Sequence, residues 1–195
     1  MKLKPIKKHI VFKFNEAVDS KGFFEKKTSW GLEIRGSGDD SAKAPRWVTV
    51  VAVGPDCELI KPGDQVLVKP LKWSIRFNFD GEQLWRTDET QLIAVDTVSD
   101  YEDKKIHNFR AMNKSVVFLR TDKQKSSVGG IEIVGRLNDD TAFGQVVDIG
   151  PDVYEVPKGA TIYFLENNFF GYFEYRSKKF CYLDELEILA YVAKE

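Results

Sequence analysis

VVAVGPD (Val50–Asp56) recurs almost unchanged 96 positions later as VVDIGPD (Val146–Asp152). The same offset aligns residues 50–95 with residues 146–191 without a gap. Self-similarity at a fixed period marks a repeated structural unit. We therefore interpret the chain as a duplication of one unit, and the organisation of each half follows from this segment.

Upstream of the repeated segment the two copies differ in length. Leu-Glu-Ile at 32–34 aligns with Ile-Glu-Ile at 131–133 at an offset of 99, and the segment at 9–12 aligns with 115–118 at an offset of 106. The first copy thus has ten more residues than the second in the region around residues 32–34. Surface loops tolerate such differences in length. We expect two domains, 1–99 and 100–195, with long loops at about 15–45 and 120–142.

Within each half the pattern predicts short strands separated by turns. Val-Thr-Val-Val-Ala-Val and Gln-Val-Val-Asp-Ile are rich in β-branched residues, and Gly-Pro-Asp follows each as a turn. We predict further turns at 61–64, at 157–160 and near Asp80-Gly81. One short helical turn is expected at each of Asp88–Thr90 and Asp184–Leu186. The fold class predicted is all-β, as small barrels or sandwiches.

Composition excludes several classes of function. The chain has 195 residues, with 29 basic and 30 acidic side chains and a net charge of −1, which argues against a general nucleic-acid binder or a binder of anionic membranes. It has no run of 18 apolar residues that would predict a membrane span. The apolar part of the N-terminal segment is too short and too charged for a signal peptide. We expect a cytoplasmic protein.

No set of residues predicts catalysis or metal binding. Cys57 and Cys181 lie at non-equivalent positions, and neither has a Cys or His at ligand spacing, as is also true of the isolated His9 and His107. Paired carboxylates at 39–40 and 139–140 have no accompanying base, nucleophile or metal set, so solvated loop ends are expected. The sequence predicts no enzyme and no cofactor.

Taken in order, the motifs resemble the GroES-type co-chaperonins, once in each half. The opening segment at 1–12 is similar to the family's first strand, and Gly-Leu-Glu-Ile and Gly-Gly-Ile-Glu-Ile are similar to its mobile loop. Val-Val-Ala-Val-Gly-Pro-Asp with Lys-Pro-Gly-Asp-Gln-Val resembles the central strands, and 187–193 resembles the last strand. Because the roof hairpin of bacterial members has no room here, the closest resemblance is to tailed-phage co-chaperonins, in tandem form.

The resemblance implies two tandem GroES-like, partly open β-barrels with long loops. It also implies docking through those loops on an ATP-bound GroEL-type chaperonin of the host, in the bacterial cytoplasm if the chain is phage-encoded. Other implied partners are an unfolded client inside the chamber, with a phage capsid protein as a candidate, and further copies of the chain in a ring. The family forms rings of seven barrels, which two barrels per chain do not divide evenly. The implied chaperonin-binding residues are Gly31, Leu32, Glu33, Ile34, Gly129, Gly130, Ile131, Glu132 and Ile133.

Glu33 and Glu132 depart from the family's docking tripeptide, where an apolar residue is common. In an extended segment alternate side chains face opposite ways, so the flanking aliphatic residues can still enter a groove while the glutamate faces water. The alternative is that these aliphatics are ordinary half-buried strand residues.

Two other functions stay open. A phage structural or virion protein could reuse the same barrel without binding a chaperonin, because fold does not determine function. The aromatic segment at 164–175 could stack single-stranded nucleic acid, although core and subunit interface are the expected roles given its balanced charge.

Overall fold

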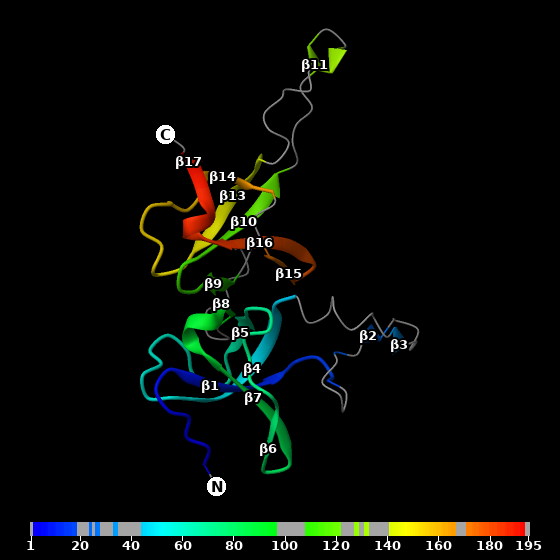
Figure 1. Cartoon of the computed structure of the whole chain (residues 1–195), viewed down its shortest axis with the longest axis vertical. Coiled ribbons are helices and arrows are strands. Elements are labelled where there is room, and N and C mark those ends of the chain that lie inside the picture. Colours follow the sequence, from blue (N-terminus) through cyan, green and yellow to red (C-terminus); the bar gives the residue numbers. More distant parts are fainter. Residues whose placement is uncertain are drawn as a thin grey trace. The chain divides into compact units, whose positions relative to one another are not determined.

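The computed structural model of the chain describes residues 2–18, 24, 26–27, 33–34, 44–96, 108–121, 127–128, 131–132, 141–166 and 171–193. These residues form an all-β structure with two single-turn 3₁₀ helices, and the chain divides into two compact units, Met1–Met112 and Asn113–Glu195 (Figure 1). The all-β class predicted from the sequence is therefore confirmed. No helix in the described part of the chain is long and apolar enough to cross a membrane.

The first unit is built on one seven-stranded sheet in the order β6-β7-β1-β4-β5-β8-β9, with every neighbouring pair antiparallel. A separate two-stranded sheet joins β2 and β3. The elements of this unit are β1 (His9–Phe14), β2 (Lys26–Lys27), β3 (Glu33–Ile34), β4 (Arg46–Val53), β5 (Gln65–Val68), β6 (Phe77–Phe79), β7 (Glu82–Asp88), η1 (Glu89–Gln91), β8 (Leu92–Asp96) and β9 (Phe109–Ala111).

The second unit is built on a six-stranded sheet in the order β15-β16-β10-β13-β14-β17, again antiparallel throughout. A second two-stranded sheet joins β11 and β12. The elements are β10 (Ser115–Thr121), β11 (Ser127–Val128), β12 (Ile131–Glu132), β13 (Thr141–Ile149), β14 (Thr161–Leu165), β15 (Gly171–Tyr175), β16 (Lys178–Asp184), η3 (Glu185–Glu187) and β17 (Ile188–Val192).

Six strands of the first sheet have the same order as the six strands of the second, and β9 is an additional strand of the first sheet. Their irregularities match too: the register shifts after Val11 between β1 and β4, and after Val117 between β10 and β13. A second pair of shifts follows Leu67 and Tyr163, at the β5–β8 and β14–β17 pairings. Because a bulge adds a residue at a defined point of a ladder, matched bulges show that the duplication extends to backbone detail.

The predicted glycine turns have the expected geometry at 61–64 and 157–160. Gly63 and Gly159 have φ of 97° and 81°, and Asp64 and Ala160 close the turns by donating to the carbonyls of Lys61 and Pro157. Positive φ is the conformation for which glycine carries no steric cost.

Gly54 does not have a positive φ, so its place in the Gly-Pro-Asp turn does not depend on a left-handed conformation. A Cβ on Gly54 would instead overlap the backbone carbonyl of Lys7. The glycine of Gly-Pro-Asp is therefore required by the close approach of another backbone segment, which is the second common reason for glycine in sheet proteins.

The two expected helical turns are present as 3₁₀ turns, one residue later than predicted. Asp88 and Asp184 are their N-caps, and the carboxylate Oδ1 of each accepts from the backbone N–H two residues on, that of Thr90 or Leu186. An aspartate in this position satisfies a backbone donor that the short turn leaves without a partner.

Each unit has its own apolar core, and many of the core positions are equivalent in the two repeats. In the first unit the core holds Ile10, Phe12, Val48, Val50, Ile60, Val66, Val68, Trp85, Leu92, Val95 and Met112. In the second it holds Val116, Phe118, Ala142, Val146, Val153, Val156, Ile162, Phe164, Cys181 and Leu183. Gly144 occupies the position that corresponds to Val48 in the first unit, because a Cβ added at this position would overlap the Phe118 ring. That ring lies 5.0 Å from the ring of Phe164.

The first unit extends beyond the predicted boundary at 99/100. Strand β9 follows that boundary, yet it pairs with β8 and completes the first sheet. The segment that begins the second repeat by sequence is thus the last strand of the first unit.

Candidate functional site

Both predicted docking segments lie in the connection between the first two long strands of a unit. The first lies between β1 and β4, and the second between β10 and β13. Each connection contains a two-stranded antiparallel sheet that is separate from the large sheets. The two repeats therefore carry a small extra hairpin at the same topological position.

The second strand of each hairpin contains the glutamate of the docking motif. In the first, Lys26 is paired with Ile34 and Lys27 with Glu33. In the second, Ser127 is paired with Glu132 and Val128 with Ile131. The backbone is thus extended at Glu33–Ile34 and Ile131–Glu132, as docking by β-type pairing would need. The other predicted docking residues, Gly31, Leu32, Gly129, Gly130 and Ile133, lie outside the described residues.

The two hairpins differ in the length of their connection. Five residues separate β2 from β3, whereas only Gly129-Gly130 separates β11 from β12. Two-residue connections favour turns with positive φ, for which Gly-Gly is a suitable sequence. The connection of the first hairpin is therefore longer in sequence than that of the second.

An aromatic cluster lies at the base of the first loop, and sequence analysis did not predict it. The ring of Phe14, at the end of β1, lies 4.7 Å from Trp85, 5.3 Å from Trp73 and 4.8 Å from Phe24, all edge-on. Phe24 also forms a bridge with Val18. The cluster joins the end of β1 to a residue ten positions further along the loop.

Arg46, the first residue of β4, closes the other side of this cluster. Its guanidinium lies 4.1 Å from the centroid of the Phe24 ring, and its Nη1 forms an ion pair with Glu16. Cation–π contacts of this kind contribute about 0.5–2 kcal/mol. The segments on both sides of the first loop are therefore tied together at its base.

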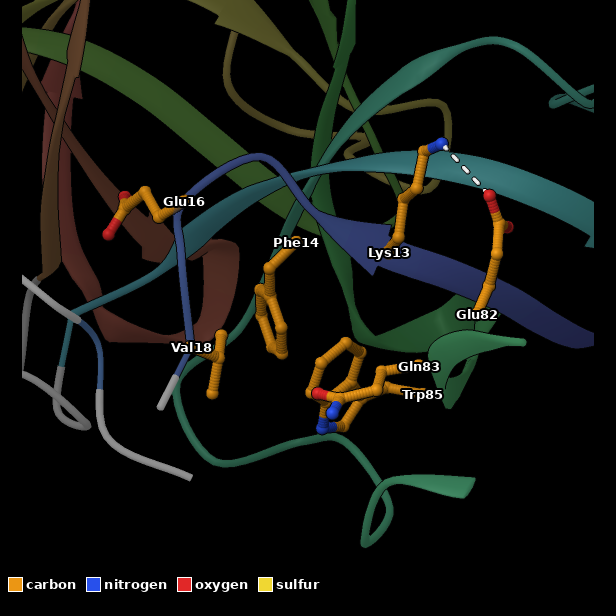
Figure 2. Close-up of a pocket in the computed structure, with 7 residues that line it drawn as sticks. All are labelled: Lys13, Phe14, Glu16, Val18, Glu82, Gln83 and Trp85. Carbon is orange, nitrogen blue, oxygen red and sulfur yellow. Dashed lines mark ion pairs between the residues drawn. The ribbon is translucent and has the colours of Figure 1, made fainter. Parts of the chain in front are cut away.

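A pocket of about 270 Å³ lies beside this cluster. Figure 2 shows the residues that line it, which are Lys13, Phe14, Glu16, Val18, Glu82, Gln83 and Trp85. The rings of Phe14 and Trp85 lie together in the middle of the view, and the ion pair of Lys13 with Glu82, 3.9 Å long, lies at one side. The lining thus combines two aromatic rings and one valine with charged and amide side chains, so the pocket is mixed in character.

The base of the second loop is polar. Arg120, near the end of β10, forms an ion pair with Glu166 at the end of β14. Arg120 occupies the position of Phe14 in the other repeat, and Cys181 that of Trp85. The aromatic base is therefore a property of the longer loop, and the two loops have diverged in how they are anchored.

The aromatic segment at 164–175 belongs mainly to the core in its described part. Phe164, Phe173 and Tyr175 are buried. Tyr172 is exposed, and Lys179 Nζ lies 3.9 Å from the centroid of its ring. Of the two roles expected for this segment, core is thus confirmed for these three rings, and a continuous stacking platform for bases is not formed by them.

Both cysteines are free thiols. Burial raises the pKa of the Cys181 thiol, and burial together with the nearby Glu89 carboxylate raises that of Cys57. A raised pKa disfavours the nucleophilic thiolate. Among the described residues no group of three or more His, Cys, Asp or Glu side chains could hold a metal ion.

No protein-family model matches the chain, and no curated protein matches it.

Proposed function

We propose that the chain is a co-chaperonin, made of two tandem GroES-like, partly open barrels. It would cap an ATP-bound, GroEL-type chaperonin ring in a bacterial cytoplasm and help to enclose an unfolded client. Its docking groups would be the aliphatic residues Leu32 and Ile34 in the first loop and Ile131 and Ile133 in the second. It would act as a non-enzymatic partner of the chaperonin ATPase.

One observation carries this proposal. In both repeats the Glu-containing docking motif lies on a small hairpin that is separate from the large sheet and follows the same strand. An ordinary half-buried strand residue would belong to one of the large sheets, and Glu33, Ile34, Ile131 and Glu132 do not. Duplicated placement outside the large sheets supports a role in binding a partner.

The energetics fit a cap that attaches and later leaves. Burying one Leu or Ile yields about 1.5–3 kcal/mol, so two per loop yield about 3–6 kcal/mol. Ordering the loop backbone costs about 1–2 kcal/mol per residue, so a single loop binds weakly. Several loops held by one assembly bind strongly through their effective concentration, and they release when the chaperonin changes state.

The test is co-sedimentation of the full chain with a bacterial GroEL-type chaperonin, with and without ATP. The double variant Ile131→Ser/Ile133→Ser should weaken binding at least tenfold, and Leu32→Ser/Ile34→Ser should weaken it in the same direction. Glu132→Gln is the matched control, because it keeps both aliphatic side chains, and it should bind like the unaltered chain. Binding that is independent of all four aliphatics would overturn the proposal, as would no binding by the unaltered chain.

A further inference from the structure

The sheet ladders close the two docking loops at different lengths. In the first repeat the last pair between β1 and β4 joins Phe14 to Val48, and 33 residues lie between these two positions. In the second repeat the last pair between β10 and β13 joins Thr121 to Phe143, which encloses 21 residues. The ladder alone therefore leaves the first loop much longer than the second.

Side chains close the first loop a second time. The guanidinium of Arg46 lies 4.1 Å from the centroid of the Phe24 ring, and 21 residues lie between these two positions. This closure therefore encloses as many residues as the ladder of the second repeat does. We call the two enclosed segments, 25–45 and 122–142, the docking spans.

Several contacts hold Phe24 at the start of the first docking span. Its ring lies 4.8 Å from the ring of Phe14 and 6.3 Å from that of Trp73, and its backbone forms a bridge with Val18. Phe14, Val18 and Trp73 in turn pack against the core of the first unit. We call these contacts, together with the one to Arg46, the clasp. Because the clasp is joined to the core, Phe24 is a fixed end for the span that follows it.

Arg46 fixes the other end of the first docking span. It is buried, it pairs with Val68 of β5 in the sheet, and its side chain forms an ion pair with Glu16. The planar guanidinium can stack on a ring and pair with a carboxylate at the same time. The second repeat has Ala142 at the position of Arg46. The arginine is thus found in the repeat whose loop needs the additional closure.

Both docking motifs lie near the middle of their spans. The first motif, 32–34, begins eight residues after one fixed end of its span and stops twelve residues before the other. The second motif, 131–133, has ten residues on each side by the same count. An extended chain covers about 3.4 Å per residue, so the shorter arm limits the two motifs to about 27 and 34 Å from their bases. Without the clasp, the shorter arm of the first loop would have 14 residues and would allow about 48 Å.

We propose that Phe24 and Arg46 are positioning residues that give the two docking motifs nearly the same reach. The ten extra residues of the first copy then serve the clasp and add nothing to the docking span. Motifs of equal reach can occupy like sites on one partner at the same time, as a ring of identical subunits presents them. This joint docking rests on the proposed function, whereas the clasp rests only on the contacts within the first unit.

The length of a docking span affects how tightly a linked motif binds. The effective concentration of a tethered group falls roughly as the −3/2 power of the length of its connecting chain. A first span of 33 residues in place of 21 would therefore lower the effective concentration of its motif about twofold. In an assembly that docks through several first loops, this factor applies to each of them.

Double electron–electron resonance on the full chain tests the clasp without any partner. Spin labels are placed at Lys27→Cys and Asn78→Cys in a background without the two native cysteines. Lys27 is three residues after Phe24, so it lies within about 10 Å of the clasp and the distance distribution should be narrow. Phe24→Ala should broaden the distribution at least twofold, whereas Phe24→Tyr, which keeps the ring, should leave it narrow. A distribution that is equally broad with and without the Phe24 ring would overturn the proposal.

Two insertions of the same twelve Gly and Ser residues test the reach, and both keep the clasp residues. Placed between residues 20 and 21, before Phe24, the insertion should leave the label distances and the binding to a GroEL-type chaperonin unchanged. Placed between residues 38 and 39, within the docking span, it should weaken binding about twofold for each first loop engaged. Equal weakening by the two insertions would overturn the proposal. If the unaltered chain does not bind the chaperonin, the proposed function fails, and the label distances still decide whether the clasp forms.

Discussion

The backbone N–H of Gly54 donates to the carbonyl of His9 over 2.8 Å, and the neighbouring carbonyl of Lys7 occupies the space that a side chain on Gly54 would fill. Gly150 and Ser115 repeat this bond over 2.9 Å in the second unit. The end of one long strand is thus held against the entry to another in each unit. The close approach of the Lys7 carbonyl accounts for the glycine of Gly-Pro-Asp in the first unit.

Gly54→Ala should therefore destabilise the first unit by about 1–3 kcal/mol, because the new methyl group meets backbone that cannot move aside. Calorimetric unfolding of the full chain measures the loss. Gly81→Asn is the control: Gly81 also lies in a turn, but nothing lies near its Cβ position, and asparagine tolerates its φ of 81°. Equal losses in both variants would contradict the close-approach explanation.

A glycine substitution in the turn between β15 and β16 should increase the stability of the second unit. Arg176 and Ser177 have φ of 48° and 62°, the conformation that Asp80-Gly81 adopts in the other unit. A non-glycine residue with positive φ destabilises the folded state by about 1–2 kcal/mol. Substitution by glycine removes this cost, but glycine also increases the conformational entropy of the unfolded chain, which offsets about 0.4–1 kcal/mol of the gain. Ser177→Gly should then stabilise the second unit by roughly 0.5–1 kcal/mol. Gly81→Ser should produce the opposite shift, and a stabilised Gly81→Ser would refute the reasoning.

Tyr182 should make stability fall at high pH. Burial, with a smaller contribution from Glu187, raises the pKa of Tyr182 from its ordinary 10.0 to about 12. The unfolded chain loses this proton first, so stability is retained below pH 10.0 and decreases by about 2–3 kcal/mol as pH rises to about 12. Urea unfolding at several pH values measures this slope. Tyr182→Phe should remove the decrease in stability that Tyr182 causes at high pH. Tyr154→Phe, at an 82% exposed position, should leave that decrease unchanged.

Phe24 should anchor the base of the first loop. Phe24→Ala removes ring contacts at 4.8 Å to Phe14 and 6.3 Å to Trp73, together with the Arg46 contact. We expect a loss of about 1–2 kcal/mol and a red shift of tryptophan emission as Trp73 gains water. Phe24→Tyr keeps the ring and should retain the emission maximum. An unchanged spectrum in Phe24→Ala would show that the cluster does not depend on Phe24.

Much of the fold could be predicted because the duplication supplies each signal twice. The long strands, the 61–64 and 157–160 turns and the aspartate-capped turns all rest on local patterns, and the structure has them. The turn at Arg176-Ser177 has no glycine or asparagine, so its positive φ could be found only by alignment with Asp80-Gly81. Strand β9 could not be placed, because its three residues carry no strand pattern apart from the edge of β8 that they cover.

The candidate site could be predicted only in part. Glu33, Ile34, Ile131 and Glu132 lie within the long loops that the sequence predicted, but the small hairpins that contain them were not predicted. The aromatic base of the first loop could not be predicted, because Phe14, Phe24, Trp73 and Trp85 are distant in sequence and come together only when β1, β4 and β7 are assembled. The second unit has Arg120 and Cys181 at the positions of Phe14 and Trp85. Because neither residue is aromatic, comparison of the two repeats does not reveal the cluster.

Native mass spectrometry of the chain mixed with a bacterial GroEL-type chaperonin tests the central claim most directly. With ATP, the account predicts a complex of the chaperonin ring with whole copies of this chain, which is lost in Leu32→Ser/Ile34→Ser/Ile131→Ser/Ile133→Ser and kept in Glu33→Gln/Glu132→Gln. Free chaperonin and free chain in the presence of ATP, at concentrations that saturate the ring with its own co-chaperonin, would contradict it.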